Sequence, residues 1–332
     1  MNITVLGDGG WGTTLAILLF NKGYHLTLWS AFKDYAQYLD KKRENIKFLP
    51  GIKIPKRIEI TSDLEKSLSN KEIIILAIPS IYLRNILKEV KKYKINSLIF
   101  VSAVKGIEQK TLLRMSEVIK EELGEIKLGV LSGPTIACEV ARGIPTTCVV
   151  ASNDEKIAKL LQDVFITERF RVYTNSDVVG VELGGSLKNV IAIACGISDG
   201  LGFGTNTKAA LLTRGLAEIS RLGQAMGADA RTFAGISGLG DLVTTCMSPF
   251  SRNRWVGEEI GRGKKLKEVL KKMAMVAEGI FTTDSAYRLS LKYKVEMPIT
   301  KEVYLVLYKN KPAFRAVDDL MKRKRKGEIT GV

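Results

Sequence analysis

Histidine and cysteine are scarce in this chain of 332 residues, which contains one histidine and four cysteines. The cysteines lie at Cys138, Cys148, Cys195 and Cys246, without a C-x-x-C pair. This spacing predicts reduced thiols rather than a disulfide framework or a zinc site. The single histidine, His25, excludes a Ser-His-Asp triad and a histidine-rich metal site. A general acid in this protein must therefore be a carboxylic acid, lysine, tyrosine or cysteine, and no metal is expected.

Long apolar segments are also missing. The longest apolar run, residues 73–79, has the length of a strand, whereas about 20 residues are needed to span a bilayer. The N-terminus enters an apolar strand at once and lacks the features of a secretory signal. We therefore expect a soluble, cytoplasmic protein with no membrane insertion. Apolar residues make up 45 % of the chain, enough for a sizeable core, and the length predicts two domains.

The charge is strongly basic but dispersed. Lys and Arg outnumber Asp and Glu by 51 to 35, which gives a net charge of +16. The one dense run, residues 322–326, has no interleaved aromatic side chains on which bases could stack. We interpret this run as a solvated helix end and expect no nucleic-acid partner. The dispersed charge favours an anionic small-molecule substrate.

The first half alternates short β-branched runs with helical patterns. Strands are predicted at residues 2–6, 26–29, 73–78, 98–103, 127–131, 147–151 and 169–173. Helices are predicted between them at residues 11–21, 62–68, 81–93, 110–123 and 154–165. Near-continuous apolar strands separated by helices are typical of a parallel sheet covered on both faces. The predicted fold class is α/β, beginning with a doubly wound, Rossmann-type parallel sheet.

Strand patterning almost disappears after Asp177. The remaining sequence predicts helices at residues 179–197, 207–226, 253–261, 266–273, 282–293 and 300–308, with a glycine-rich turn at 235–240. We therefore expect a dinucleotide-binding domain over residues 1–180 and an all-α substrate and catalytic domain over residues 181–332. The active site is expected in the cleft between them.

A glycine-rich motif, G-D-G-G-W-G, directly follows the first predicted strand and opens a helix. In this G-x-G-x-x-G pattern, Gly7 permits the tight turn, Gly9 lets the backbone approach a pyrophosphate, and Gly12 lets the helix pack on the strand. The unpaired N–H groups at the helix N-terminus would face the phosphates. The motif predicts a bound dinucleotide.

The second strand ends in Trp29-Ser30-Ala31 and lacks the acidic residue that usually holds the ribose of NAD. This ending disfavours strict NAD specificity, and Lys33 could offer charge to a 2′-phosphate. A solvated helix lysine is the favoured interpretation of Lys33. Both NADPH and NADH are therefore plausible cofactors, and NADPH should be accepted.

Two segments of the second half carry candidate chemistry. Lys188 follows Gly184, Gly185 and Ser186 in an apolar helix, so burial there would lower its pKa and suit it to proton transfer. The alternative is a lysine that extends from the helix edge to solvent. A second cluster joins a glycine loop carrying Asp241 to Ser-Arg-Asn at residues 251–253. It could cradle a phosphate, or be an N-cap followed by exposed arginines.

The motifs together resemble the bacterial NAD(P)-dependent glycerol-3-phosphate dehydrogenases over essentially the whole chain. They occur in the family's order as GDGGWGT, FLPG, SAVKGIE, LSGPT, ELGGSLKNVIA, GTNTKAAL, GLGDLVTT, SRNR and VAEG, starting at residues 7, 48, 102, 131, 182, 204, 238, 251 and 276. The resemblance implies reduction of dihydroxyacetone phosphate to sn-glycerol 3-phosphate with NAD(P)H, which feeds glycerophospholipid synthesis. It also implies a homodimer.

The resemblance further implies roles for individual residues. Lys188 matches the family's proton donor and acceptor, and Asp241 could orient it or a substrate hydroxyl. The substrate-binding positions match Lys105, Gly133, Thr135, Lys188, Asp241, Ser251, Arg252 and Asn253. The cofactor positions match Gly7, Gly9, Gly10, Trp11, Gly12, Phe48, Lys105, Ala137, Arg252, Val276 and Glu278, with Tyr82 expected nearby. Relatives often carry Arg or His where this chain has Ala31, which leaves the cofactor preference open.

Two other functions stay open at this point. One is a lysine-based dehydrogenase of the 6-phosphogluconate or β-hydroxyacid kind, whose glycine-rich substrate loop differs from Ser132-Gly133-Pro134-Thr135. The other is a redox-sensing module that holds the nucleotide without turnover. Such a module has no need for Lys188 and Asp241 together.

Overall fold

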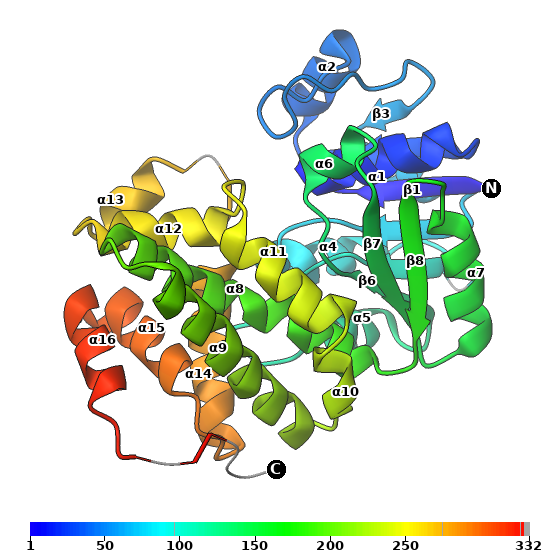
Figure 1. The fold of residues 1–332 in the computed structure, drawn as a ribbon. Helices are drawn as coiled ribbons and strands as arrows, with labels where there is room; N and C mark the ends of the chain where they lie inside the picture. Colours follow the sequence, from blue (N-terminus) through cyan, green and yellow to red (C-terminus); the bar gives the residue numbers. More distant parts are fainter. Residues whose placement is uncertain (96, 274, 326, 329–332) are drawn as a thin grey trace.

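The N-terminal half of the computed structural model contains an eight-stranded sheet with the order β3-β2-β1-β4-β5-β6-β7-β8. Figure 1 shows this half at the upper right, beside the helical C-terminal half. The structure describes residues 1–328 except 96, 274 and 326. The strands are β1 (Asn2–Leu6), β2 (His25–Trp29), β3 (Glu59–Thr61), β4 (Ile73–Leu76), β5 (Ile99–Ser102), β6 (Lys127–Ser132), β7 (Thr146–Ala151) and β8 (Phe170–Asn175).

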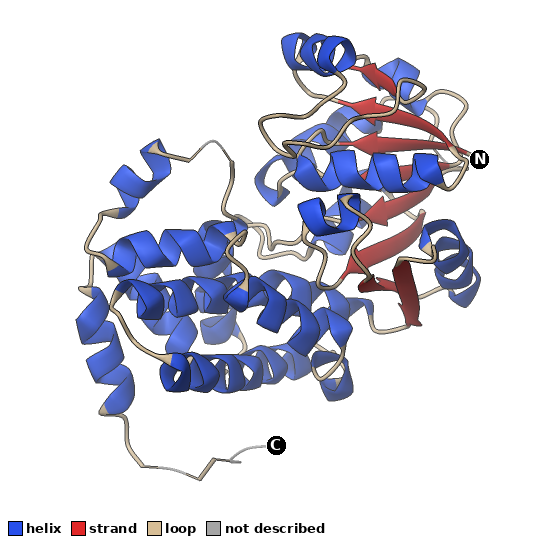
Figure 2. Ribbon diagram, turned by 45° about the horizontal axis from the view of Figure 1, so that its top comes forward, coloured by secondary structure: helices blue, strands red, loops and turns tan. Residues whose placement is uncertain are grey.

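Helices cover both faces of this sheet (Figure 2). They do so because the strands carry apolar side chains on both faces. Successive side chains of a strand point to opposite faces. Accordingly, Ile73 and Ile75 of β4 join one core, and Ile74 and Leu76 join the other. The first core includes side chains of α1 (Gly10–Asn21), α2 (Lys33–Lys42), α6 (Ala137–Ala141) and α7 (Glu155–Phe165). The second includes those of α3 (Leu64–Leu68), α4 (Ser80–Val90) and α5 (Met115–Leu123).

One strand departs from the predicted parallel arrangement. β7 pairs with β6 in the antiparallel sense, and β8 then pairs with β7 in parallel. The segment between β6 and β7 contains only the five-residue helix α6. This helix packs beside α1, where Thr14 Oγ1 donates to the carbonyl of Ala137 at 3.1 Å. The chain therefore stays at the carboxyl edge of β6 and returns antiparallel.

The part of the chain described after β8 contains helices and no strands, as predicted (Figure 2). The helices are α8 (Val178–Gly200), α9 (Thr205–Ala225), α10 (Ala230–Phe233), α11 (Asp241–Met247), α12 (Arg252–Gly261), α13 (Leu266–Lys271), α14 (Glu278–Lys292), α15 (Pro298–Lys309) and α16 (Ala313–Met321). A π-helical turn, η1 (Ile236–Gly240), replaces the predicted glycine-rich turn before α11. The basic run follows α16, and its described side chains are mostly exposed, whereas Lys326 lies outside the described residues.

Helix α8 forms the centre of the helical domain. It spans 23 residues, and its length and composition match those of a membrane-spanning helix, but 89 % of its most apolar window is buried inside the protein. Its buried carboxylate, Glu182, accepts hydrogen bonds from Ser116 N at 2.7 Å and Ser116 Oγ at 2.6 Å, and pairs with Arg114. These bonds tie α8 to the first turn of α5, so the helical domain is fixed against the sheet domain.

The strand order reverses between β1 and β4, which are adjacent in the sheet. From β1 the chain proceeds to one edge through β2 and β3, and from β4 to the other edge through β5 and β6. In open α/β sheets, ligands bind beyond the carboxyl ends of the strands at such a switch point. Gly7 lies there with φ +120°, and a Cβ atom on it would come within 2.5 Å of the carbonyl oxygen of Ala77.

Candidate active site

Two lysines from different domains share one buried carboxylate. Lys188 Nζ, from α8, lies 2.8 Å from Asp241 Oδ1. Lys105 Nζ, from the loop after β5, lies 2.7 Å from Asp241 Oδ2 and donates to the carbonyl of Gly133 at 2.8 Å. The structure therefore brings together four residues that lie far apart in the sequence. With two cations and one anion, the cluster carries a net positive charge that suits an anionic substrate.

Lys188 has the burial that a lysine acid requires. The residue is 6 % exposed and Asp241 is 1 % exposed. Burial is the largest influence on the Lys188 ammonium and lowers its pKa to about 8, while Asp241 partly offsets this and Lys105 adds to it. A pKa near the operating pH makes Lys188 able to give a proton and to take it back.

The small residues before Lys188 allow this burial. A Cβ on Gly184 would lie 2.6 Å from the carbonyl oxygen of Ser237, and one on Gly185 would lie 2.4 Å from Ser132 Oγ. Helix α8 therefore packs against the turn η1 on one side and against the end of β6 on the other. This double contact places Lys188 at the junction of the two domains.

Thr245 also belongs to the cluster, although the sequence did not point to it. Its hydroxyl accepts a hydrogen bond from Lys188 Nζ and donates to the backbone carbonyl of Asp241 at 2.7 Å. Thr245 lies one helical turn after Asp241 in α11, so the spacing of four residues could have indicated a shared face. Thr245 and Asp241 together fix the direction of the Lys188 ammonium.

The glycine loop fits a dinucleotide. A Cβ on Gly12 would lie 1.9 Å from the carbonyl oxygen of Gly7, so the helix packs too closely on the strand for any side chain there. A Cβ on Gly9 would meet no atom within 4 Å, which leaves open space in front of the backbone. Gly9 is also the N-cap of α1 and provides no side-chain acceptor. The first N–H groups of α1 thus face an open space, an arrangement that suits a pyrophosphate.

The other residues expected around the cofactor adjoin this loop in part. A Cβ on Gly10 would lie 2.6 Å from the carbonyl oxygen of Phe48 and 3.7 Å from Ala137 Cβ. Trp11 is half-buried against the core beneath α1. Tyr82, on α4, is 51 % exposed. Phe48 and Ala137 therefore flank the loop, and Tyr82 offers an accessible ring at the carboxyl edge of the sheet.

Gly133 and Thr135 adjoin the lysine cluster. Gly133 follows β6 with φ +141°, and its carbonyl accepts from Lys105 Nζ at 2.8 Å. Thr135 Oγ1 donates to the same carbonyl at 3.2 Å. Both residues thus lie beside Lys105, at the carboxyl end of the sheet.

In the Ser-Arg-Asn segment, Ser251 and Asn253 make structural hydrogen bonds, whereas Arg252 is accessible. Ser251 is the N-cap of α12, and its hydroxyl accepts from Arg254 N at 3.2 Å. Asn253 is buried, and its amide donates to Asn189 Oδ1 at 2.8 Å and accepts from Gly279 N at 2.9 Å. These bonds dock α12 beside Asn189, the neighbour of Lys188. Arg252 is exposed and donates to the carbonyl of Val276 at 2.7 Å.

Glu278 joins the helical domain to the switch point. Its carboxylate accepts from Ser80 N at 2.9 Å and from the Ser80 hydroxyl, at the start of α4. Burial raises the pKa of Glu278, and the hydrogen bonds from Ser80 and the charge of Arg252 partly offset that rise. Val276, Glu278 and Arg252 are therefore grouped near the end of β4, where the resemblance expects the cofactor.

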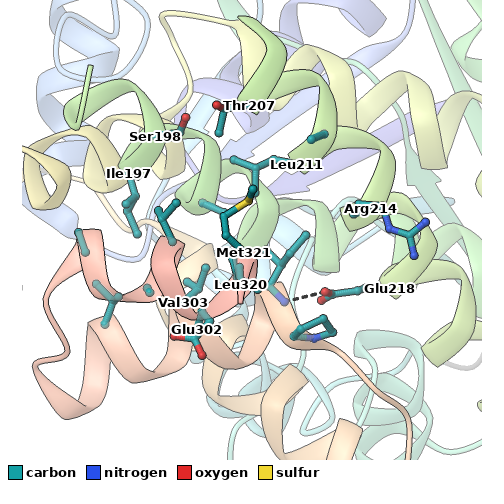
Figure 3. A pocket seen from close by; sticks show the side chains of 18 of the residues that line it. Ile197, Ser198, Thr207, Leu211, Arg214, Glu218, Glu302, Val303, Leu320 and Met321 are labelled. Atoms are coloured by element: carbon teal, nitrogen blue, oxygen red, sulfur yellow. Dashed lines mark hydrogen bonds between the residues drawn. The ribbon is translucent and has the colours of Figure 1, made fainter. Parts of the chain in front are cut away.

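A separate cavity of about 230 Å³ lies between α8, α9, α15 and α16 (Figure 3). None of the residues assigned above to catalysis, substrate or cofactor lines it. Its buried Glu218 accepts from Ile299 N at 2.6 Å and Thr300 N at 3.1 Å, so it caps α15. Burial raises the pKa of Glu218 to about 7. We assign this carboxylate a structural role. Among the described residues, no group of three His, Cys, Asp or Glu side chains could hold a metal ion.

Comparison with known proteins gives a consistent result over the full length. Residues 2–158 match the family model described as the N-terminus of NAD-dependent glycerol-3-phosphate dehydrogenase, and residues 177–318 match that of its C-terminus. The chain is 53 % identical to "Glycerol-3-phosphate dehydrogenase [NAD(P)+]" of Thermoanaerobacter sp. (strain X514) over 100 % of both chains. It is 51 % identical to the protein of the same name in Syntrophotalea carbinolica, covering 99 % of this chain and 100 % of that one.

A solved structure agrees with these matches. The crystal structure of glycerol-3-phosphate dehydrogenase from Coxiella burnetii has a TM-score of 0.94 and 38 % identity, covering 97 % of this chain and 99 % of that one. The chain thus contains the glycine loop and the lysine–carboxylate cluster, and it matches both the N-terminal and the C-terminal family model. The protein belongs to the NAD-dependent glycerol-3-phosphate dehydrogenase family.

Proposed function

We propose that this protein reduces dihydroxyacetone phosphate to sn-glycerol 3-phosphate, with NADH or NADPH as the reductant. The observation that carries the proposal is the buried cluster of Lys188, Asp241 and Lys105 at the junction of the two domains. A ketone that accepts a hydride becomes an alkoxide and needs a proton as it forms. Lys188 is the group in the cluster with a pKa suited to supply that proton.

The residues of this chain divide the work of the reaction. The nicotinamide, when bound, supplies the hydride. Lys188 donates its proton to the carbonyl oxygen and becomes a neutral amine. Asp241 and Thr245 hold the ammonium in a fixed direction before the transfer. In the reverse reaction the neutral amine of Lys188 takes the proton from the hydroxyl group.

The substrate phosphate has a binding place close to Lys188. The first turn of α12 is docked beside Asn189 through Asn253. Arg252 lies in this turn, is exposed, and donates a hydrogen bond to the backbone carbonyl of Val276. We assign the phosphate to Arg252 and the N-terminus of α12, where a guanidinium and free N–H groups favour a dianion.

The two domains have separate tasks in this proposal. Residues 1–180 supply most of the dinucleotide site, to which Arg252, Val276 and Glu278 of the second domain contribute. Residues 181–332 supply the catalytic lysine and the phosphate site. The division falls in the first turn of α8, which begins at Val178. Lys105, Gly133 and Thr135 belong to the first domain but face the cluster, so the substrate lies between the domains.

The wider role follows from the resemblance to the bacterial family. We infer that the protein acts in the cytoplasm as a homodimer and that its product feeds glycerophospholipid synthesis. Analytical ultracentrifugation of the purified chain tests the assembly, and a sedimentation coefficient of a 36.6 kDa monomer at all concentrations would overturn the homodimer.

Oxidation of NADH and of NADPH with dihydroxyacetone phosphate is the direct test of the reaction. We expect turnover that depends on both the ketone and the reduced cofactor, and sn-glycerol 3-phosphate as the product. Oxidation of a β-hydroxyacid with NAD⁺ or NADP⁺, and no turnover with the phosphorylated ketone, would favour the β-hydroxyacid dehydrogenases. Binding of cofactor without any turnover would favour a redox-sensing module.

A further inference from the structure

The carboxyl end of β2 has an acidic side chain beside it that comes from another strand. Strands β1 and β2 are parallel neighbours, with Leu6 opposite Trp29, and Gly7 N donates to the carbonyl of Trp29 at 3.0 Å. The residue that follows Gly7 is Asp8, and its carboxylate accepts a hydrogen bond from the hydroxyl of Ser30. Asp8 thus reaches the position at which a dinucleotide-binding fold usually carries an acid on the second strand.

The Asp8 carboxylate is held in place by Ser30 and takes part in no ion pair within the described part of the chain. Ser30 is fully buried, and its hydroxyl also accepts from Phe32 N at 3.3 Å, which fixes the oxygen that Asp8 contacts. Among the residues that the structure describes, no Lys or Arg nitrogen forms an ion pair with Asp8 within 4 Å. Burial raises the pKa of Asp8, while Ser30 and the charge of Lys47 oppose this rise.

We propose that Asp8 is the residue by which this protein prefers NAD(H) to NADP(H). The carboxylate would accept hydrogen bonds from the ribose hydroxyl groups of NAD(H) and would repel the 2′-phosphate of NADP(H). The inference uses the dehydrogenase assignment only for the class of cofactor. It revises the expectation drawn from the ending Trp29-Ser30-Ala31, because the missing acid is supplied from the glycine loop.

The lysines of this region do not reverse the preference. Lys47 lies over the rings of Phe48 and Tyr35, with Nζ 5.0 Å and 5.9 Å from their centroids. The charge of Lys47 acts on Asp8, but within the described part of the chain no ion pair joins the two side chains. Lys33 is exposed in the first turn of α2, where the attraction between its ammonium and a phosphate is screened by solvent. Asp8 is the charged group fixed at the end of β2.

Binding measurements on the full chain test this proposal without the reaction. Isothermal titration calorimetry is done with NAD⁺ and NADP⁺, and with adenosine 5′-monophosphate and adenosine 2′,5′-bisphosphate, which lack the nicotinamide. We expect the wild type to bind NAD⁺ at least about tenfold more tightly than NADP⁺, and Asp8→Asn to reduce this ratio at least about tenfold. Asp8→Asn keeps an oxygen acceptor for Ser30, and thermal unfolding checks its fold.

A matched control separates position from charge. Asp34→Asn removes the same charge from the exposed first turn of α2 and should leave the ratio within about twofold. Equal or tighter binding of NADP⁺ by the wild type would overturn the proposal, whether or not the variant folds. An unchanged ratio in Asp8→Asn would overturn it as well, and so would an equal effect of Asp34→Asn. If the ratios behave as expected but dihydroxyacetone phosphate is not reduced, the proposed function fails and the role of Asp8 stands.

Discussion

Two clusters on helix α8 have the same composition, one carboxylate between two cations, but different surroundings. Near the middle of the helix, Asp241 lies between Lys188 and Lys105. At its C-terminal end, Asp199 lies 2.6 Å from Lys208 Nζ and 2.6 Å from Arg254 Nε. The side chains of Lys188 and Asp241 are 7 % and 2 % exposed, against 15 % and 14 % for Lys208 and Asp199.

The difference in burial shows when a lysine in an ion pair can act as a general acid. Burial of Lys188 outweighs the attraction of Asp241, so its pKa falls to about 8. The Asp199 cluster keeps more contact with water and joins three helices, α8, α9 and α12. We interpret it as a structural tie.

The largest expected difference is between the variants of Lys188 and Lys208, one lysine from each cluster. We expect Lys188→Met to lower kcat by about 10²- to 10⁴-fold, because the alkoxide loses its proton donor. Lys208→Met should lower the melting temperature and leave kcat within about tenfold of wild type. Steady-state kinetics, calorimetry and cofactor titration provide the measurements. Similar losses of kcat in both variants would contradict the distinction.

Arginines two positions apart on α12 provide the second comparison. Arg252→Ala should raise KM for dihydroxyacetone phosphate by roughly 10- to 100-fold, since a charge-assisted contact to a dianion contributes about 1.5–3 kcal/mol. Arg254→Ala removes one of the two cationic partners of Asp199 and should reduce stability with little change in KM. An unchanged KM in Arg252→Ala would assign that arginine to the solvated surface.

Removing the shared carboxylate should shift the acid itself. In Asp241→Asn the attraction that favours the charged form of Lys188 is lost, so its pKa should fall further below the value of about 8. The pH at which reduction begins to decline should move down by about one unit or less. Thermal unfolding is the control for folding, because unpaired buried cations destabilise proteins. A shift to higher pH would show that Asp241 does not act on Lys188.

Local patterns predict much of this fold. Three predicted features depend on short-range sequence patterns, and the structure has all three. They are the glycine loop, the alternation of strands and helices, and the change to helices alone in the part described after Asp177. The short elements β3, α2, α6, α10, α11 and α16 were not predicted. In β3 the three residues are all half-buried and give no apolar signal, and α2 has a largely polar sequence with only Ala36 and Leu39 buried.

The site was harder to predict because its contacts join distant segments. Lys188 and Asp241 were chosen separately from the sequence, and only the packing of α8 against η1 and α11 shows that they touch. Thr245 was missed because a threonine in an apolar helix usually has no catalytic or binding function. Asp8 received no role from the sequence because it fills a variable position of the glycine motif, and its proximity to Ser30 depends on the register of β1 and β2. Side-chain partners across the sheet are not encoded in either segment alone.

The most direct test of the central claim, that Lys188 exchanges a proton with the substrate, is the pH dependence of kcat/KM in both directions. Reduction needs the ammonium, so its kcat/KM should fall above about pH 8, by up to about tenfold per pH unit. Oxidation of sn-glycerol 3-phosphate needs the neutral amine, so its kcat/KM should rise up to about the same pH and then level off. Opposite slopes around one shared pKa, absent in Lys188→Met, are the predicted result. Parallel slopes in the two directions, or a reduction rate that is flat from pH 7 to about 10, the range in which an unperturbed lysine stays charged, would contradict the account.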